Sequence, residues 1–454
     1  MASAAEQLAA TLNFGVLAKA TELKKRIWFT LGALIVYRLG TYIPIPGIDP
    51  VVLAEIFRQQ QGGVLGMFDM FSGGALGRMT IFALNVMPWV SASIIMQLMT
   101  AVSPRLEQLK KEGPAGQKVI NQYTRYGTVV LALLQAYGIA IGLEGTRGAS
   151  GGAVIDPGLT FRISTVVTLT GGTMFLVWLG EQMTQRGVGN GLSVIIMGGI
   201  VAGLPQAIAA TLELGRTGAL STIFIILLLT MAVGVVFFVV FIERAQRRLI
   251  VQYPKRQVGQ RMFGGESSHL PLRLNTSGVI PPIFASSLLL MPTTIAGFSA
   301  AQTAPTGEGP SEIMSLIATY LAHGTPLYML LYVFLIAFFA FFYTAIVFNP
   351  EETADNLKRY GGFIPGIRPG KNTADYLDHI LSRLTVLGAV YLSVVCILPE
   401  ILISKFAVPF YFGGTSLMIV VTVTMDVVAQ IHAHLVAHQY EGLIKKAKLR
   451  GRKG

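Results

Sequence analysis

The sequence predicts an all-α membrane protein whose chain crosses the bilayer ten times, in two halves of five helices each. Its composition is typical of polytopic membrane proteins, because 52% of the 454 residues are hydrophobic, only 13% are charged and the mean hydropathy is +0.60. Ten apolar stretches of about 17–25 residues have the length that a tilted helix needs to cross a bilayer core. They lie near 27–43, 79–100, 124–143, 161–183, 190–210, 220–242, 276–297, 326–348, 380–402 and 411–433.

Basic residues predict the orientation of these spans. Most of the 35 Lys and Arg residues fall in segments that alternate spans place on one side of the membrane, and cytoplasmic segments carry such an excess. Both termini are therefore expected in the cytoplasm, the N-terminal segment over 1–26 and a basic tail over 435–454. Two cytoplasmic loops, 243–275 and 349–379, are longer than orientation requires and are expected to contact a cytosolic partner. Orientation and anionic lipid headgroups account for the net charge of +12 without DNA binding.

The spans divide into an N-terminal half over 27–218 and a C-terminal half over 219–434. Five spans lie in each half, and an odd number makes the two halves cross the membrane in opposite senses. Transport proteins with inverted halves place their functional path at the interface between them. No residue-level repeat accompanies this symmetry, so the expectation rests on topology.

One stretch, from Gly62 to Thr100, indicates what occupies that path. Its second part, from Ile81, carries no charge and would rise about 30 Å as a helix, enough to span. Its first part is rich in glycine and contains Asp69 and Arg78, so it is too polar to face lipid. An irregular segment fused to a membrane helix must lie inside protein or line a wet cavity. It is therefore a candidate for a segment that occupies a pore.

Pairs of aliphatic residues could close such a pore by expelling water. Val86 and Val90 lie on one face of the second span and straddle Pro88, which is predicted to kink the helix. Leu192 and Ile196 have the same spacing in the fifth span. The alternative for each pair is an ordinary core or lipid-facing position.

Sites of other kinds are missing from the sequence. The glycine cluster Gly187–Gly191 lacks the Lys-Ser/Thr of a phosphate-binding loop and is interpreted as a turn between two helices. His432, His434 and His438 have no carboxylate or cysteine at ligand spacing, so no metal site is expected. The single cysteine, Cys396, is interpreted as a packing residue. No catalytic set and no cofactor motif are found.

Two other classes of function are alternatives, a membrane enzyme and a secondary transporter of small solutes. The sequence contains no catalytic set that would support the enzyme hypothesis. Ion-coupled carriers usually place several ionisable residues near the middle of the membrane. Here few residues are plausible candidates, namely Arg38 toward the outer end of the first span and Asp426 toward the inner end of the last. A passive, partner-driven channel is therefore the favoured class.

Long motifs, in order along the chain, carry a family resemblance. They are PIPGID at 44–49, MFDMFSGGALGRMTIFALNVMPWVSASIIMQL at 67–98, QYTRYGT at 122–128, WLGEQMTQRGVGNG at 178–191, ERAQRRLIVQYPKRQ at 243–257, HLPLRLN at 269–275, FNPEETADNLKRYGGFIPGIRPG at 348–370 and VPFYFGGTS at 408–416. With these motifs the chain closely resembles, essentially end to end, the SecY family, the channel subunits of the bacterial protein translocase.

The resemblance implies that spans 1–5 and 6–10 form a clamshell around an hourglass-shaped central pore. It implies a plug on the outer side near 64–77, which includes Leu65, Met67, Phe68, Met70, Phe71, Ser72, Gly73 and Gly74. It also implies a constriction made by Val86, Val90, Leu192, Ile196, Ile283 and Ile419. The family often has isoleucine in this ring, whereas three positions here carry valine or leucine.

A lateral gate between spans 2 and 3 on one side and 7 and 8 on the other is implied as well. Its residues in this sequence are Met87, Ser91, Ile95, Pro282, Ser286 and Ser287. In the seventh span the adjacent Pro281 and Pro282 are expected to remove helix hydrogen bonds and to kink the helix. Signal helices would leave the pore through this gate into lipid.

The two large loops resemble docking sites for the SecA motor and the ribosome. The implied docking residues are Arg368, in the turn 365–370, and Arg248, Lys255, Arg256 and Arg261. The resemblance further implies SecE-like and SecG-like membrane subunits, signal-bearing precursor polypeptides as cargo, and a place in the bacterial inner membrane.

Overall fold

The structure is a computed structural model, and it describes residues 20–54, 69, 72–145, 147–148, 151–217, 221–253, 256–258, 261–263, 267–289, 320, 325–406 and 414–450. Within these ranges the chain is mostly helical. Seven of the described helices are long and apolar enough to cross a membrane. The helix bounds are α3 Thr21–Gly40, α6 Met87–Val102, α7 Pro104–Lys111, α8 Pro114–Gly145, α9 Leu159–Arg186, α10 Gly191–Arg216, α11 Thr222–Arg244, α14 Pro326–Val347, α15 Pro350–Arg359, α16 Lys371–Phe406 and α17 Gly414–Arg450.

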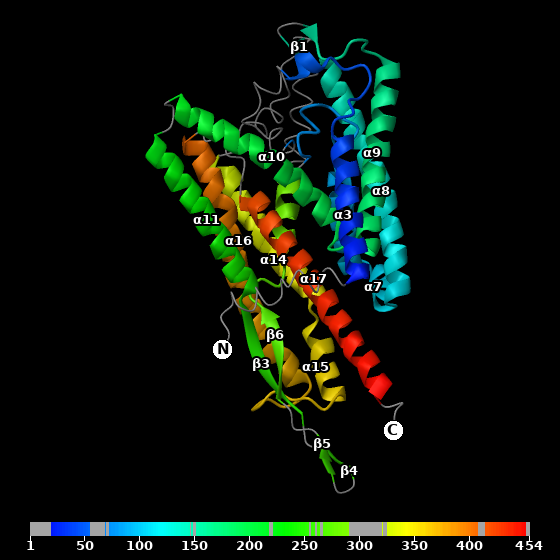
Figure 1. Ribbon diagram of the computed structural model, residues 1–454, viewed down its shortest axis with the longest axis vertical. Coiled ribbons are helices and arrows are strands. Elements are labelled where there is room, and N and C mark those ends of the chain that lie inside the picture. The colour runs from blue at the N-terminus through cyan, green and yellow to red at the C-terminus, as the bar shows by residue number, and fades with distance from the viewer. Residues whose placement is uncertain are drawn as a thin grey trace.

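The helices form two groups that meet along α10 and α17 (Figure 1). In the first group α8 packs against α6 and α9, and α3 packs against α9; in the second group α14 packs against α16, and α11 and α16 pack against α17. A short apolar helix, Ile280–Leu289, adds a member to the C-terminal half. Each of the ten predicted spans thus overlaps a helix in the described part of the chain, and the seventh span lies outside the described residues after 289.

The second span differs from its prediction. Helix α6 begins at Met87, and residues 79–86 before it form turns in which Met79 and Asn85 have positive φ. The helix therefore rises about 24 Å, at about 1.5 Å per residue, instead of 30 Å. Pro88 lies in its first turn, where the missing N–H has no intrahelical partner to lose, so the predicted kink is wrong.

The two long loops contain structure that the sequence analysis did not predict. Strand β3, Gln246–Gln252, pairs antiparallel with β6, Ser267–Arg273, and β4, Arg256–Val258, pairs with β5, Arg261–Phe263. Gln252 also forms a bridge with Phe363 of the second loop. This hairpin projects beyond the helices beside α15 (Figure 1). At the opposite end lies the short pair of β1, Arg147–Gly148, and β2, Gly151–Gly152.

The predicted glycine turn is confirmed. Helix α9 ends at Arg186 and α10 begins at Gly191, with Gly189 between them at a φ of +87°. A Cβ on Gly191 would lie 2.0 Å from the carbonyl oxygen of Gly180, so a larger residue would push the two helices apart. The turn is therefore a tight connection between adjacent spans.

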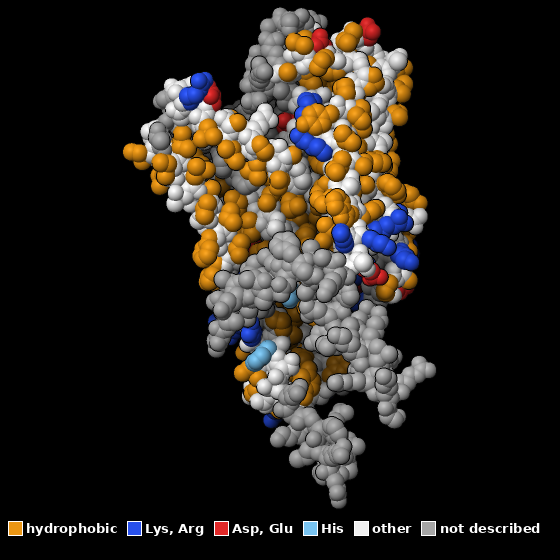
Figure 2. All heavy atoms as spheres, viewed as in Figure 1, with side chains coloured by type: hydrophobic (Ala, Val, Ile, Leu, Met, Phe, Trp, Pro, Cys, Tyr) orange, Lys and Arg blue, Asp and Glu red, His pale blue; other side chains and the backbone are white. Residues whose placement is uncertain are grey.

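Large apolar side chains cover much of the outside of the helices (Figure 2). On α11 alone, Ile223 is 80% exposed and Phe237 is 74% exposed. Water would penalise this surface, whereas hydrocarbon tails would not. The chain is therefore a multi-pass membrane protein.

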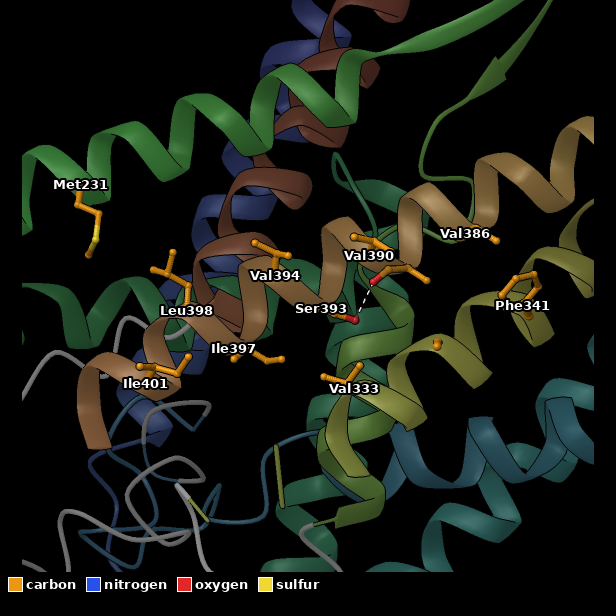
Figure 3. A pocket seen from close by; sticks show the side chains of 12 residues that line it. Met231, Val333, Phe341, Val386, Val390, Ser393, Val394, Ile397, Leu398 and Ile401 are labelled. Atoms are coloured by element: carbon orange, nitrogen blue, oxygen red, sulfur yellow. Dashed lines mark hydrogen bonds between the residues drawn. The ribbon is translucent and has the colours of Figure 1, made fainter. Parts of the chain in front are cut away.

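A groove of about 810 Å³ opens in this apolar surface between α11, α14 and α16 (Figure 3). Its lining contains one polar side chain, Ser393, whose hydroxyl donates to the carbonyl of Ala389 in its own helix at 2.7 Å. None of the predicted ring residues lines it. The groove therefore belongs to the surface that faces lipid and not to the predicted pore.

Candidate pore, lateral gate and plug root

The six predicted ring residues lie in one apolar cluster that joins the two halves of the chain. Five of them are at most 7% exposed, and Ile283 is partly buried against the same cluster. They come from four elements: Val86 and Val90 from the start of α6, Leu192 and Ile196 from α10, Ile283 from the helix Ile280–Leu289, and Ile419 from α17. The structure therefore brings together residues that are up to 333 positions apart in the chain.

Local structure explains how Leu192 reaches this cluster. Asn190 caps α10, because its side-chain oxygen accepts a hydrogen bond from the Leu192 amide at 3.2 Å. A Cβ on Gly180 would lie 2.6 Å from the Leu192 side chain, so the glycine leaves the space that Leu192 fills. The sequence offered the four-residue spacing of Leu192 and Ile196 but no signal for this role of Gly180.

The predicted gate residues lie on α6 and on the helix Ile280–Leu289, and residues of both elements belong to the same cluster as the ring. Met87 is buried, Ser91 is half-buried and Ile95 is 46% exposed. Pro282 and Ser286 are buried, and the Ser286 hydroxyl donates to the Ile283 carbonyl. The Ser287 hydroxyl has no hydrogen-bond partner within the described ranges.

The expected kink at the proline pair is also wrong within the described residues. The helix begins at Ile280, so Pro281 and Pro282 occupy its first turn. Amides of the first turn have no carbonyl partner inside the helix, and proline costs little there. The pair therefore starts this helix and does not bend it.

Most of the predicted plug lies outside the described residues, namely Leu65, Met67, Phe68, Met70 and Phe71. Asp69 and residues 72–78 are described, and we call them the plug root. The first helix holds the plug root from one side. The hydroxyl of Tyr37 donates to the Ser72 carbonyl at 3.2 Å, and the Arg38 guanidinium donates to the Gly73 carbonyl at 2.9 Å.

Arg78 contacts the backbone of the plug root as well. Its guanidinium also donates to the Gly73 carbonyl, at 3.2 Å, and lies 4.2 Å from the centre of the Tyr42 ring. Arg38 lies 4.9 Å from the centre of the same ring. Both guanidinium groups thus lie over the ring of Tyr42, whose π-electrons attract a positive charge. The sequence singled out Arg38 as an intramembrane charge but did not predict this contact.

Asp69 turns back onto the plug root. Its carboxylate accepts a hydrogen bond from the Gly77 amide, and the Gly74 amide donates to its backbone carbonyl at 2.8 Å. Burial raises the pKa of the Asp69 carboxyl, although the Gly77 amide and the Arg78 charge act in the opposite direction. Burial therefore destabilises the ionised form of Asp69.

The predicted docking residues are placed at the hairpin end of the molecule. Arg248 is exposed on β3, opposite Pro271, and Arg368 is exposed in the turn that contains Gly366 and Gly370, both with positive φ. Arg256 and Arg261 lie on the paired strands β4 and β5, and Lys255 falls outside the described residues. The bridge between Gln252 and Phe363 brings the two loops together as one surface.

No group of three or more metal-ligating side chains occurs among the described residues. His432 and His434 are exposed on α17, and Cys396 is buried, where its sulfur accepts a hydrogen bond from Thr415. The described residues therefore offer an apolar cluster at the predicted ring and polar contacts at the plug root.

Comparisons with known proteins agree with this geometry. The family model for SecY matches residues 80–428. The Protein translocase subunit SecY of Rickettsia conorii is 56% identical over 94% of this chain and 97% of its own length. The protein of the same name from Escherichia coli K12 is 54% identical over 95% of this chain and 96% of its own length.

Solved structures show the same fold at low sequence identity. A protein-conducting channel has a TM-score of 0.66 at 17% identity and covers 91% of this chain and 93% of that chain. Sec61 in a canine ribosome–channel complex from the endoplasmic reticulum has a TM-score of 0.62 at 16% identity, with coverage of 91% and 93%. Family model, relatives and fold agree, and the chain belongs to the SecY family.

Proposed function

We propose that this chain is the central protein-conducting channel of the general secretory translocase. It passes unfolded, signal-bearing polypeptides across the membrane and releases apolar segments laterally into lipid. The observation that carries the proposal is the uncharged cluster between the two halves, in which all six ring residues take part. The relatives that share more than half of its sequence are named protein translocase subunits.

An aliphatic ring suits this task. Methyl groups attract any neighbouring chain by dispersion, so a ring of them closes around a polypeptide without selecting its sequence. When no polypeptide is present, a narrow apolar constriction excludes water and therefore ions. The segment near 64–77 is proposed as a plug that adds a second barrier, held at its root by Tyr37, Arg38 and Arg78.

The lateral exit is proposed between α6 and the helix Ile280–Leu289. Ser91 and Ser286 are small, and small residues allow two helices to pack closely and still separate. An apolar signal helix of about 20 residues would move from such an opening into lipid because hydrocarbon solvates it better than water.

Energy for transport comes from partners in this proposal, because the chain is a channel and not an enzyme, and it needs no cofactor. The hairpin end is proposed as the cytoplasmic docking surface for a SecA-type motor driven by ATP, or for the ribosome. Arg368 and Arg248 are exposed there and can bind carboxylates on a motor or phosphates of RNA. SecE-like and SecG-like subunits, anionic lipids, cytoplasmic termini and the bacterial inner membrane complete the proposal.

The test is protease protection of a signal-bearing precursor in proteoliposomes that contain this chain with a SecE-like subunit. We expect protection only when SecA and ATP are both present. A transport-incompetent precursor without its signal is the matched control. If vesicles with folded complex protect no precursor, either with SecA and ATP or with translating ribosomes, the channel function is wrong.

A further inference from the structure

The strand β6 leads within a few residues into the proposed gate helix Ile280–Leu289, and Asn275 occupies this junction. Its side chain is buried, at 3% exposed. The amide nitrogen donates to the Glu243 carboxylate at 2.7 Å and to the Gly278 carbonyl at 3.0 Å. The amide oxygen accepts from the Ser277 hydroxyl at 3.0 Å. Three of the four hydrogen bonds that an asparagine side chain can make are therefore formed within the protein.

Glu243 lies on a different element, in the last turn of α11. The Asn275 contact therefore crosses the base of the hairpin, where the chain leaves α11 and where it returns. Backbone contacts close the same base: the Leu274 amide donates to the Ala245 carbonyl at 3.0 Å, and Gln246 pairs with Arg273. The side-chain contact is thus the last tie before the chain turns at Gly278 and enters the gate helix.

Helix α16 limits movement of this junction. A Cβ on Gly388 would lie 3.3 Å from the Leu274 carbonyl oxygen and 3.6 Å from the Asn275 Cα. The junction therefore packs directly on the backbone of α16 at this glycine. With α11 on one side and α16 on the other, the start of the gate helix has fixed neighbours in the C-terminal half.

The Glu243 carboxylate needs the Asn275 donor. It is half-buried, the Arg273 guanidinium favours its charge and the Asp426 carboxylate opposes it, and the Tyr391 side chain lies beside it. A buried carboxylate that loses a hydrogen-bond donor becomes strongly unfavourable. Replacement of Asn275 by an apolar residue would therefore leave both the carboxylate and the Gly278 carbonyl without this donor.

We propose that Asn275 and Glu243 form a clasp that fixes the start of the gate helix to α11 and so holds the lateral gate closed. In this role Asn275 is a positioning residue, because it acts on the gate through the helix that follows it. The clasp also makes the hairpin and the gate helix one mechanical unit, so that a partner bound to the hairpin acts on the gate. The inference rests on the proposed channel function.

The test measures gate width in the complex with a SecE-like subunit, reconstituted in lipid nanodiscs. Spin labels are attached to cysteines at Ile95 of α6 and Leu288 of the gate helix, which are 46% and 47% exposed. Without precursor, Asn275→Leu is expected to raise the ratio of open to closed gate about 10- to 100-fold, the effect of losing a hydrogen bond to a charged group. Asn275→Asp is expected to act in the same direction, because it places two carboxylates together.

A charge-compensated pair keeps the test independent of folding defects. In Glu243→Gln combined with Asn275→Asp the donor and the acceptor are exchanged, so the double variant is expected to regain much of the closed population that Asn275→Asp loses. Thr276→Val is the matched control, since the Thr276 hydroxyl is exposed and bonds only the Arg273 carbonyl nearby. It is expected to leave the distance distribution unchanged.

The outcomes separate the clasp from the channel function. If both Asn275 variants give the distance distribution of the unchanged protein, the clasp is wrong, even when transport is normal. If Asn275→Asp opens the gate but the double variant stays equally open, contact between these two side chains is not the cause and the clasp is again wrong. If instead no precursor is transported and no precursor widens the gate, the proposed channel function is wrong. The gate distances of the Asn275 variants and the unchanged protein, measured without precursor, still test the clasp.

Discussion

Arg38 and Arg78 both donate to the carbonyl of Gly73, and both guanidinium groups lie against Tyr42. A carbonyl oxygen has two lone pairs, so it can accept both donors at once. This gives Arg38 a role in the last turn of the first span that does not involve ion coupling. It holds the backbone at the root of the proposed plug.

Asp69 makes the plug root sensitive to pH. Because burial raises its pKa, the folded root binds the proton more tightly than the unfolded chain does. Its stabilising contribution is therefore present at low pH and is lost as the pH rises through the raised pKa. Above that raised pKa the ionised carboxylate opposes the folded root.

Asp69→Asn is accordingly expected to stabilise the plug root at neutral pH. The amide oxygen can still accept the Gly77 hydrogen bond, and no charge is buried. In planar bilayers, spontaneous ion openings should become severalfold rarer at neutral pH, while the difference should vanish in acid. More frequent openings of the variant at neutral pH would contradict this account. Asp49→Asn serves as the control, because the Asp49 carboxylate accepts a hydrogen bond from the Val51 amide, outside the plug root.

At the scale of elements, the two large loops form a single surface. Leu249 and Leu272 of the hairpin are buried in one apolar cluster with Ile364 of the second loop and Leu377 of α16. The backbone bridge between Gln252 and Phe363 adds a hydrogen bond in each direction, at 2.9 and 3.0 Å. A partner that contacts Arg368 therefore contacts a loop that packs against the hairpin, and the hairpin leads into the proposed gate helix.

Arg368→Glu tests this surface. The change reverses an exposed charge in a turn whose backbone is unaltered, so the fold should be kept. We expect SecA-dependent transport to fall about tenfold, the effect of losing charge-assisted hydrogen bonds to a partner, while insertion of the chain into the membrane stays normal. Arg359→Glu on α15 makes the same charge change at an exposed site in the same loop. Equal transport by the two variants would remove the special role of Arg368.

At the scale of the whole molecule, closure depends on contacts between the halves. The ring combines α6 and α10 of the N-terminal half with the gate helix and α17 of the C-terminal half. Because α10 and α17 pack against each other, a movement of either half changes the ring. The pore is therefore a property of the assembled halves and not of either alone.

Ile196→Ser tests the ring against its surroundings. Ile195→Ser is the control, because Ile195 is buried on the same helix but points about 100° away around the helix axis. Each serine should lower the free energy of unfolding by about 2–5 kcal/mol, as losses of large buried aliphatic groups do. Ion leakage should rise about tenfold only for Ile196→Ser, because a hydroxyl in the constriction favours water there. Equal leakage for both variants would indicate general loosening and not a ring.

The sequence by itself determined the class of fold and the approximate position of the spans, although the second helix begins eight residues after its predicted start. Hydrocarbon thickness sets a length that about 20 apolar residues must fill, so stretches such as 220–242 and 326–348 are visible from composition alone. The glycine turn before Gly191 and the orientation signal are equally local. Family motifs then pointed to the ring residues, because long motif matches in the same order allow single positions of the family to be located in this sequence.

Only the tertiary structure decided how prolines and loops are used. A proline such as Pro88 or Pro281 can either kink a helix or lie in its first turn. Which of the two occurs depends on where the preceding segment packs and therefore on where the helix begins. The hairpin of β3 and β6 pairs residues 15 to 27 positions apart, from Gln252 with Ser267 to Gln246 with Arg273, and it needs a bridge to Phe363. Asn275 with Glu243, and Arg38 with Gly73, are contacts between distant segments. No local pattern specifies such contacts, because they exist only after the segments have packed.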